Sequence, residues 1–315
     1  MRWWVVVAIL VAALAVGLLL GRPRMPAPPP AAGAERSAEE GAAPTDIPPP
    51  IRGSITVTTT ETADCSGPAD AAARANAASV DGLAWSPFGR PETGWRIYAT
   101  LIGAEIGTRC PPESAAFATR LAEWQRRHAL SPDGLMSGAV FDRLKTAWHA
   151  RRPLVLSIRA RGCPAPPAPD RLETARISEG YRGKSVQARP AVLAAYRRMV
   201  ADARRDDPAI AADPQMLTIF SAYRDPASDA LRCLREGNCD GVRRARSCSP
   251  HRTGLALDLT VGAAPGFTVD STADPNRLAQ SRTPAYRWLV ANAGRYGFVN
   301  YPFEPWHWEW TGEAP

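Results

Sequence analysis

Lysine and histidine are both scarce in this 315-residue chain. Lys145 and Lys184 are its two lysines, so arginine carries almost all of the positive charge behind the formal net charge of +7. Alanine and proline are also frequent, so the nucleotide composition of the coding sequence accounts for the excess of arginine. We therefore expect no nucleic-acid partner. With 45% hydrophobic and 22% charged residues, a wholly disordered or coiled-coil chain is excluded.

The usual zinc signatures are also absent. The chain has no Cys-x-x-Cys pair and no His-Glu-x-x-His segment, and its His-Trp-Glu segment lacks the Pro-Cys-x-x-Cys of a deaminase. Its six cysteines follow an apolar N-terminal segment, which predicts disulfides in an oxidising compartment. Because Cys233, Cys239 and Cys248 are crowded together, we expect at least one local disulfide among them.

The N-terminus carries an export signal of one kind or another. Trp3 to Leu20 is an unbroken run of 18 apolar residues, which spans roughly 27 Å as a helix, just enough for a bilayer core. The residues that follow make a poor cleavage site. We therefore favour a membrane anchor over residues 1–20, with a removable signal segment as the alternative. Either would place the rest of the chain in the bacterial cell envelope, outside the cytoplasmic membrane in the periplasm.

Proline-rich stretches divide the remainder of the chain. Residues 21–50 hold nine prolines and seven alanines, a composition that favours an extended linker over a packed core. A second proline-rich linker covers residues 163–170. The chain between them, residues 51–162, is expected to form a helical domain, and residues 171–315 have the length of one further domain.

Residues 94–150 have apolar residues at helical spacing, with Ser137 placed to cap the last helix. The Trp124-Gln125 pair and the turn that ends at Gly134 are similar to the three-helix peptidoglycan-binding module of cell-wall enzymes. This resemblance implies docking on peptidoglycan. A helical spacer without a ligand is the alternative.

Helices come first in residues 171–315 and short strands follow, which predicts an α+β fold with a small antiparallel sheet. The pattern indicates helices over Pro190–Asp202 and from Pro284 to Tyr296. Strands are expected within Met216–Ser221, Gly254–Thr260 and Phe298–Tyr301.

The last expected strand separates two kinds of side chain. Trp306, Trp308 and Trp310 fall on one face and are interpreted as core, whereas His307 and Glu309 fall on the other. We interpret Glu309 as structural or as support for a metal ligand. The remaining histidines outside this region, His128 and His149, are interpreted as structural.

Asp258 points away from the leucine face of the Gly254–Thr260 strand, and His251 lies seven residues before it. Together with His307 these residues offer two imidazoles and a carboxylate, the ligand types of a catalytic zinc site with an open fourth position. Glu304, three residues before His307, is placed to take a proton from water.

These residues stand in a recognisable order. The segments Ser249-x-His251-x-x-Gly254-x-Ala256-x-Asp258 and Glu304-x-Trp306-His307, with Ser221-x-Tyr223-Arg224 upstream, resemble the VanY-type D-alanyl-D-alanine carboxypeptidases. That family belongs to the fold group of lysostaphin-type peptidases and the hedgehog domain. The resemblance covers roughly residues 185–311. Where family members often carry Gln after the Ser-x-Tyr-Arg segment, this chain has Ser228 and Asp229.

The resemblance implies a role for each matching residue. His251, Asp258 and His307 would bind Zn²⁺, Glu304 would be the catalytic base, and Arg224 would polarise the scissile carbonyl. Ser249, Tyr223 and Ser221 would contact substrate, although Ser249 could instead be a turn residue.

The function implied is hydrolysis of the terminal D-Ala-D-Ala bond of peptidoglycan stem peptides. An endopeptidase that cuts within stem peptides or cross-bridges remains an alternative, as does a zinc-containing wall-binding domain without turnover.

Overall fold

The computed structural model of the protein describes residues 64–235 and 248–315. Its α-helices are α2 (Asp70–Ser79), α3 (Ala99–Ile106), α4 (Ala115–Arg127), α5 (Gly138–His149), α6 (Pro153–Arg161), α7 (Pro190–Asp206), α8 (Pro208–Ala212), α9 (Pro226–Arg235), α10 (Asp274–Ser281) and α11 (Pro284–Asn292). Its strands are β1 (Ala84–Trp85), β2 (Glu92–Thr93), β3 (Glu173–Thr174), β4 (Gln187–Ala188), β5 (Ile219–Ser221), β6 (Ala256–Leu259), β7 (Phe298–Asn300) and β8 (His307–Trp310).

The helical part of the structure runs from α2 to α6. Helices α2 to α5 pack around a core of their own, which includes Trp95, Phe117, Leu121 and Phe141. The serine caps explain where two of these helices begin. Ser114 accepts a hydrogen bond from the Phe117 amide at the start of α4. Ser137 accepts one from the Val140 amide at the start of α5, which confirms the expected cap.

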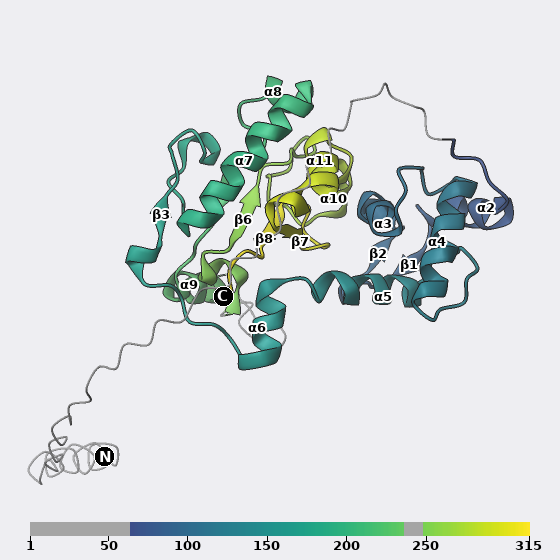
Figure 1. The fold of residues 1–315 in the computed structure, drawn as a ribbon, viewed down its shortest axis with the longest axis horizontal. Helices are drawn as coiled ribbons and strands as arrows, with labels where there is room; N and C mark the ends of the chain where they lie inside the picture. Colours follow the sequence, from purple (N-terminus) through teal and green to yellow (C-terminus); the bar gives the residue numbers. More distant parts are fainter. Residues whose placement is uncertain (1–63, 236–247) are drawn as a thin grey trace, which may run out of the picture. The chain divides into compact units, whose positions relative to one another are not determined.

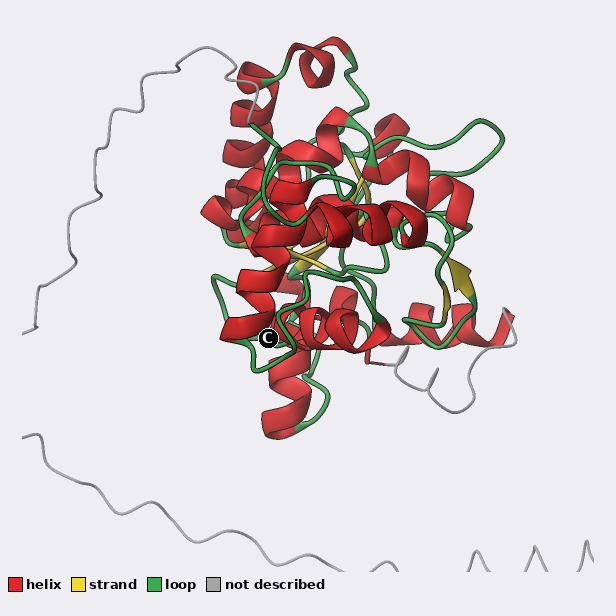
Figure 2. Ribbon diagram, turned by 90° about the vertical axis from the view of Figure 1, so that its right-hand side faces the viewer, coloured by secondary structure: helices red, strands yellow, loops and turns green. Residues whose placement is uncertain are grey.

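A four-stranded antiparallel sheet forms the centre of the following part, in the order β5-β6-β8-β7. Helices α7 and α11 flank β6 and β8 in Figure 1, and Figure 2 shows helices around the strands at the centre of the picture. Buried side chains from α7, α11 and the sheet form a second core, which takes in Leu257, Trp306 and Trp308. The expected α+β class is confirmed, and Trp306 and Trp308 are core residues as interpreted, whereas Trp310 is partly buried and packs against this core.

The expected helices and strands in this part are present with shifted ends. The helix expected from Pro190 continues to Asp206 as α7. The helix from Pro284 ends at Asn292, and a 3-10 helix, η6 (Ala293–Tyr296), carries the chain on to Gly297. Gly297 has a φ of +85°, a left-handed conformation that glycine adopts without strain.

Two disulfides join distant segments. Cys65 bonds to Cys110, and Cys163, just after α6, bonds to Cys248. Cys248 is therefore bonded to a residue far from it in sequence, and the expectation of at least one local disulfide among Cys233, Cys239 and Cys248 stays a prediction. The side chains of Cys233 and Cys239 fall outside the described residues.

No helix within the described residues is long and apolar enough to cross a membrane. The anchor expected over residues 1–20, the linker over residues 21–50 and the start of the expected helical domain lie outside them. The proposed domain boundaries stay a prediction.

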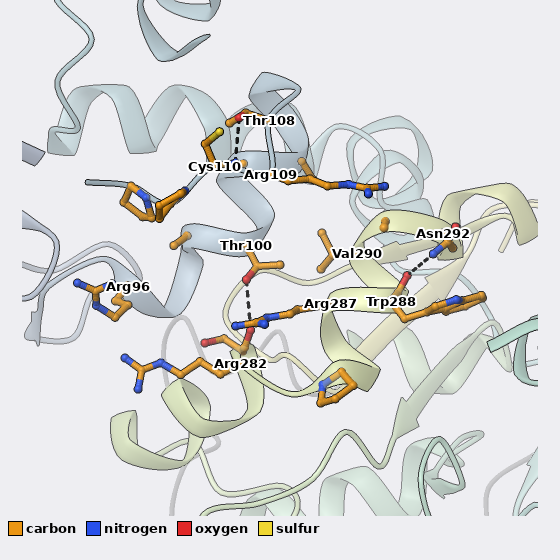
Figure 3. Close-up of a pocket in the computed structure, with 18 of the residues that line it drawn as sticks. Arg96, Thr100, Thr108, Arg109, Cys110, Arg282, Arg287, Trp288, Val290 and Asn292 are labelled. Atoms are coloured by element: carbon orange, nitrogen blue, oxygen red, sulfur yellow. Dashed lines mark hydrogen bonds between the residues drawn. The ribbon is translucent and has the colours of Figure 1, made fainter. Parts of the chain in front are cut away.

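The described residues belong to one compact unit, and polar contacts join its helical part to its sheet. Thr100 of α3 donates a hydrogen bond of 3.2 Å to the Ser281 carbonyl at the end of α10, seen as a dashed line in Figure 3. The groove drawn there is lined by several arginines, among them Arg109, Arg282 and Arg287. It holds none of the predicted site residues.

Candidate metal centre and catalytic cleft

Strand pairing brings two of the predicted metal ligands together. Asp258 of β6 lies directly opposite His307 of β8 in the antiparallel register. His251 lies in a short 3-10 helix, η5 (Pro250–Thr253), which ends at Gly254 with a φ of +69°. A Cβ on Gly254 would meet Leu172 and Arg189 at 3.1 and 3.2 Å, so this turn into β6 requires glycine.

The three predicted ligands form a tight buried cluster. Nε2 of His251 lies 3.1 Å from Oδ2 of Asp258, and Nδ1 of His307 lies 2.8 Å from Oδ1 of the same carboxylate. The donor atoms of all three residues lie within 4.8 Å of one another, and each residue is buried. It is the one group of three or more potential ligands found in the described part of the chain.

The other nitrogen of each ring is turned toward an oxygen. Nδ1 of His251 lies 2.7 Å from the Ala222 carbonyl, an acceptor, so this nitrogen carries the proton and Nε2 keeps its lone pair. Nε2 of His307 lies 3.4 Å from Oε1 of Glu309, longer than an ordinary hydrogen bond. His251 can thus present the unprotonated Nε2 to a metal held beside Asp258, and His307 can do so through Nδ1 when its proton is on Nε2.

These donors fit a zinc ion. Imidazole nitrogens and carboxylate oxygens are ligands that zinc takes, and one such atom from each of the three residues lies within 4.8 Å of the others. Two imidazoles and one carboxylate leave a fourth position for water or substrate. The cluster can therefore hold a catalytic metal.

The electrostatics of the cluster favour a bound cation. Burial alone would raise the pKa of Asp258, but His251 and His307 hold it well below its usual range. Burial alone would lower the pKa of His307, but Asp258 and Glu309 raise it to about 9. For His251 burial prevails and lowers the pKa. The ionised Asp258 carboxylate needs positive charge beside it, which a metal ion can supply.

Glu304 lies in the loop between β7 and β8. Asn300 anchors this loop by donating its side-chain amide to the Glu304 carbonyl at 3.2 Å. The side chain lines the same cleft as His251, Asp258 and His307, which has a volume of about 1040 Å³. Burial raises the pKa of Glu304, as the charge of Asp258 does, although nearby cations oppose this. A raised carboxyl pKa suits a group that must both take and return a proton.

Arg224 reaches into the cleft and is held by three side chains. Its guanidinium donates to Ser221 at 2.9 Å, to Ser249 at 3.1 Å and to Asp229 at 2.9 Å. Tyr223 lines the same cleft. The structure thus brings together all of the residues to which sequence analysis assigned catalytic or substrate-binding roles.

Two contributors to the cleft were not predicted. Asp229 is 6% exposed and fixes Arg224, at the place where the family often carries Gln. Helix α6 of the helical part lines the cleft with Leu154, Val155 and Ile158. The departure from the family pattern marked the place of Asp229, whereas no sequence pattern indicates that α6 lies beside the sheet.

The other two histidines take no part in the cluster. Nδ1 of His128 lies 2.8 Å from the Trp124 carbonyl, and its ring stacks on that tryptophan. His149 packs against Phe88 and Tyr301, and burial lowers its pKa to about 4.

A potential metal cluster and a half-buried carboxylate, Glu304, that line one cleft could together carry out hydrolysis. Residues 185–313 match the family model of VanY, D-alanyl-D-alanine carboxypeptidase. This part of the chain is therefore a VanY-type domain, and that family implies a peptidase. The match does not reach the helical part, whose similarity to a peptidoglycan-binding module stays a prediction. No curated protein matches the chain.

Proposed function

We propose that the protein is a zinc-dependent D,D-carboxypeptidase that removes the terminal D-alanine from peptidoglycan stem peptides. We propose further that it works in the cell envelope outside the cytoplasmic membrane, held there by residues 1–20, and that its helical part docks on peptidoglycan. The observation that carries the catalytic proposal is the convergence of His251, Asp258 and His307 in one cleft with Glu304 and Arg224.

Each group has a chemical task in this proposal. Zinc held by His251, Asp258 and His307 would supply Lewis-acid polarisation of water and of the scissile carbonyl. Glu304 accepts the proton of the attacking water and returns it to the leaving amine of the terminal D-alanine. Arg224, which donates through both terminal nitrogens of its guanidinium, stabilises the negative charge that develops on the carbonyl oxygen.

The test uses the full-length chain in detergent, loaded with zinc, with a pentapeptide muropeptide as substrate and mass spectrometry as readout. We expect loss of one terminal alanine. Glu304→Gln keeps the shape of the side chain but cannot take a proton, so turnover should fall by about 10²–10⁴-fold while bound zinc is unchanged. Glu123→Gln, which alters an exposed carboxylate on α4, is the matched control.

Each other outcome contradicts part of the proposal. Turnover by Glu304→Gln at the wild-type rate would remove Glu304 from the reaction. Fragments cut further inside the peptide would indicate an endopeptidase. Bound zinc without any cleavage would favour a non-catalytic wall-binding domain.

A further inference from the structure

A buried ion pair links the helical part to the metal cluster. Arg152 lies immediately before Pro153 of α6, outside the VanY match, and Glu309 lies in β8 two residues after His307. Nε and Nη2 of Arg152 lie 2.7 and 2.5 Å from Oε1 of Glu309. The two side chains are 9% and 2% exposed, so the pair is shielded from water.

The surroundings leave this arginine little freedom. Its guanidinium lies over the ring of Tyr301, 4.2 Å from the ring centre. The backbone amide of Leu154 donates to Oε2 of Glu309 at 3.4 Å. The start of α6 therefore holds both oxygens of the Glu309 carboxylate, one with the guanidinium and one with the backbone.

The oxygen held by Arg152 is the one that faces the metal ligand. Oε1 of Glu309 lies 3.4 Å from Nε2 of His307, and in the described part of the chain that nitrogen has no hydrogen-bond partner. The opposite nitrogen of the ring, Nδ1, points at Asp258. A carboxylate behind a ligating histidine orients the ring and keeps the proton away from the ligating nitrogen.

We infer that Arg152 is a positioning residue, which holds Glu309 against His307 so that Nδ1 of His307 stays available to the metal. This inference rests on the metal site of the proposed function. It means that the metal affinity of the VanY-type domain depends on a residue supplied by the helical part. The Arg152 charge also compensates that of Glu309, which would otherwise be a buried carboxylate without a cationic partner.

The experiment measures the zinc affinity of the metal-free full-length chain by competition with a chromogenic chelator. We expect Arg152→Met to weaken zinc binding by about 10- to 100-fold. Arg152→Lys, which keeps the charge but loses the two-nitrogen contact, should recover part of the loss. Arg151→Gln, an exposed neighbour paired with Glu105, should bind zinc as the wild type does.

Removal of Arg152 alone could unfold the protein by stranding Glu309. The double variant Arg152→Met/Glu309→Leu removes both charges together and should keep the thermal melting of the metal-free chain near that of the wild type. Zinc binding should remain weak in the double variant, because His307 has lost its carboxylate.

Wild-type zinc affinity in a folded Arg152→Met or in the double variant would overturn the inference while leaving the proposed function intact. An equal loss in Arg151→Gln would also overturn it. Absence of zinc binding by the wild-type chain would overturn the inference and the proposed function together.

Discussion

Three side-chain contacts limit the movement of the Arg224 guanidinium. Asp229 binds Nε, so the two terminal nitrogens turn toward Ser221, Ser249 and the cleft. Nη1 also lies 3.9 Å from Oδ2 of Asp258, beside the metal cluster. The side chain of Asp229 is buried, and its second oxygen has no hydrogen-bond partner within the described residues. Asp229 therefore acts as a fixed anchor for the arginine.

This arrangement predicts the effect of removing the anchor. Asp229→Ala should lower kcat/KM on the order of tenfold, about 1.4 kcal/mol of transition-state stabilisation, because Arg224 loses its orientation. Asp229→Asn keeps an oxygen that can accept from Nε and should recover part of the activity. Steady-state kinetics on the muropeptide, with zinc content measured in parallel, makes the comparison. Unchanged kcat/KM in Asp229→Ala would show that Ser221 and Ser249 suffice to hold Arg224.

Single residues of the site differed in how far the sequence could identify them. His251 and His307 were predictable because the chain has four histidines and because their segments match the family pattern, and strand alternation placed Asp258 and His307 on the polar faces of their strands. Arg152 was not predictable, since it is one of many arginines and lies 157 residues from its partner Glu309. No local pattern records a contact over such a separation.

Helix α6 is the element that joins the two parts of the cleft. Its N-terminal end holds Glu309, and its apolar side chains Leu154, Val155 and Ile158 line the same cleft as the metal cluster. The disulfide between Cys163 and Cys248 ties the chain after α6 to the residue before Ser249. The helix therefore supplies an apolar wall to the cleft, against which the aliphatic parts of a stem peptide would pack in the proposed function.

If this apolar wall contacts the substrate, a substitution in it should change KM and leave kcat unchanged. Ile158→Ser should raise KM for the muropeptide roughly fivefold, about 1 kcal/mol of lost apolar contact, and leave kcat unchanged. Leu156→Ser is the matched control, since Leu156 is on the same helix and similarly exposed (50% against 42%) but does not line the cleft. Equal effects of the two substitutions on KM, or a fall in kcat for Ile158→Ser, would contradict this role.

Among the elements, periodicity predicted the helices that bury one face and begin at a serine cap, as α4 and α5 do, or at a proline, as α7 does. It did not predict α6, whose apolar residues are spread around the helix so that Leu154 is buried while Leu156 and Ile158 are exposed. The two-residue strands β1 to β4 are too short to show alternation.

Across the whole described unit, a second buried arginine joins the helical part to the sheet region. Arg277 of α10 has a side chain that is 0% exposed and lies 3.0 Å from Oε1 of Glu92 in β2. It also contacts the Tyr98 hydroxyl at 2.5 Å and the Phe303 carbonyl at 2.8 Å. A buried charge that depends on partners from another part of the chain couples the folding of the two parts.

Glu92→Gln tests this coupling, because it removes the charge that compensates Arg277. The free energy of unfolding should fall by roughly 3 kcal/mol, since Asp274, the remaining carboxylate at 3.1 Å, is 35% exposed. Chemical denaturation of the full-length chain should show one transition for the wild type and one transition at lower denaturant for the variant.

Glu123→Gln, which breaks an exposed pair with Arg120, should cost less than about 1 kcal/mol. Two separate wild-type transitions, or equal costs for the two substitutions, would mean that the helical part and the sheet region fold independently. If the transitions stay joined, the helical part is a structural component of the VanY-type unit, and deleting residues 94–150 would unfold that unit as well as remove the proposed docking surface.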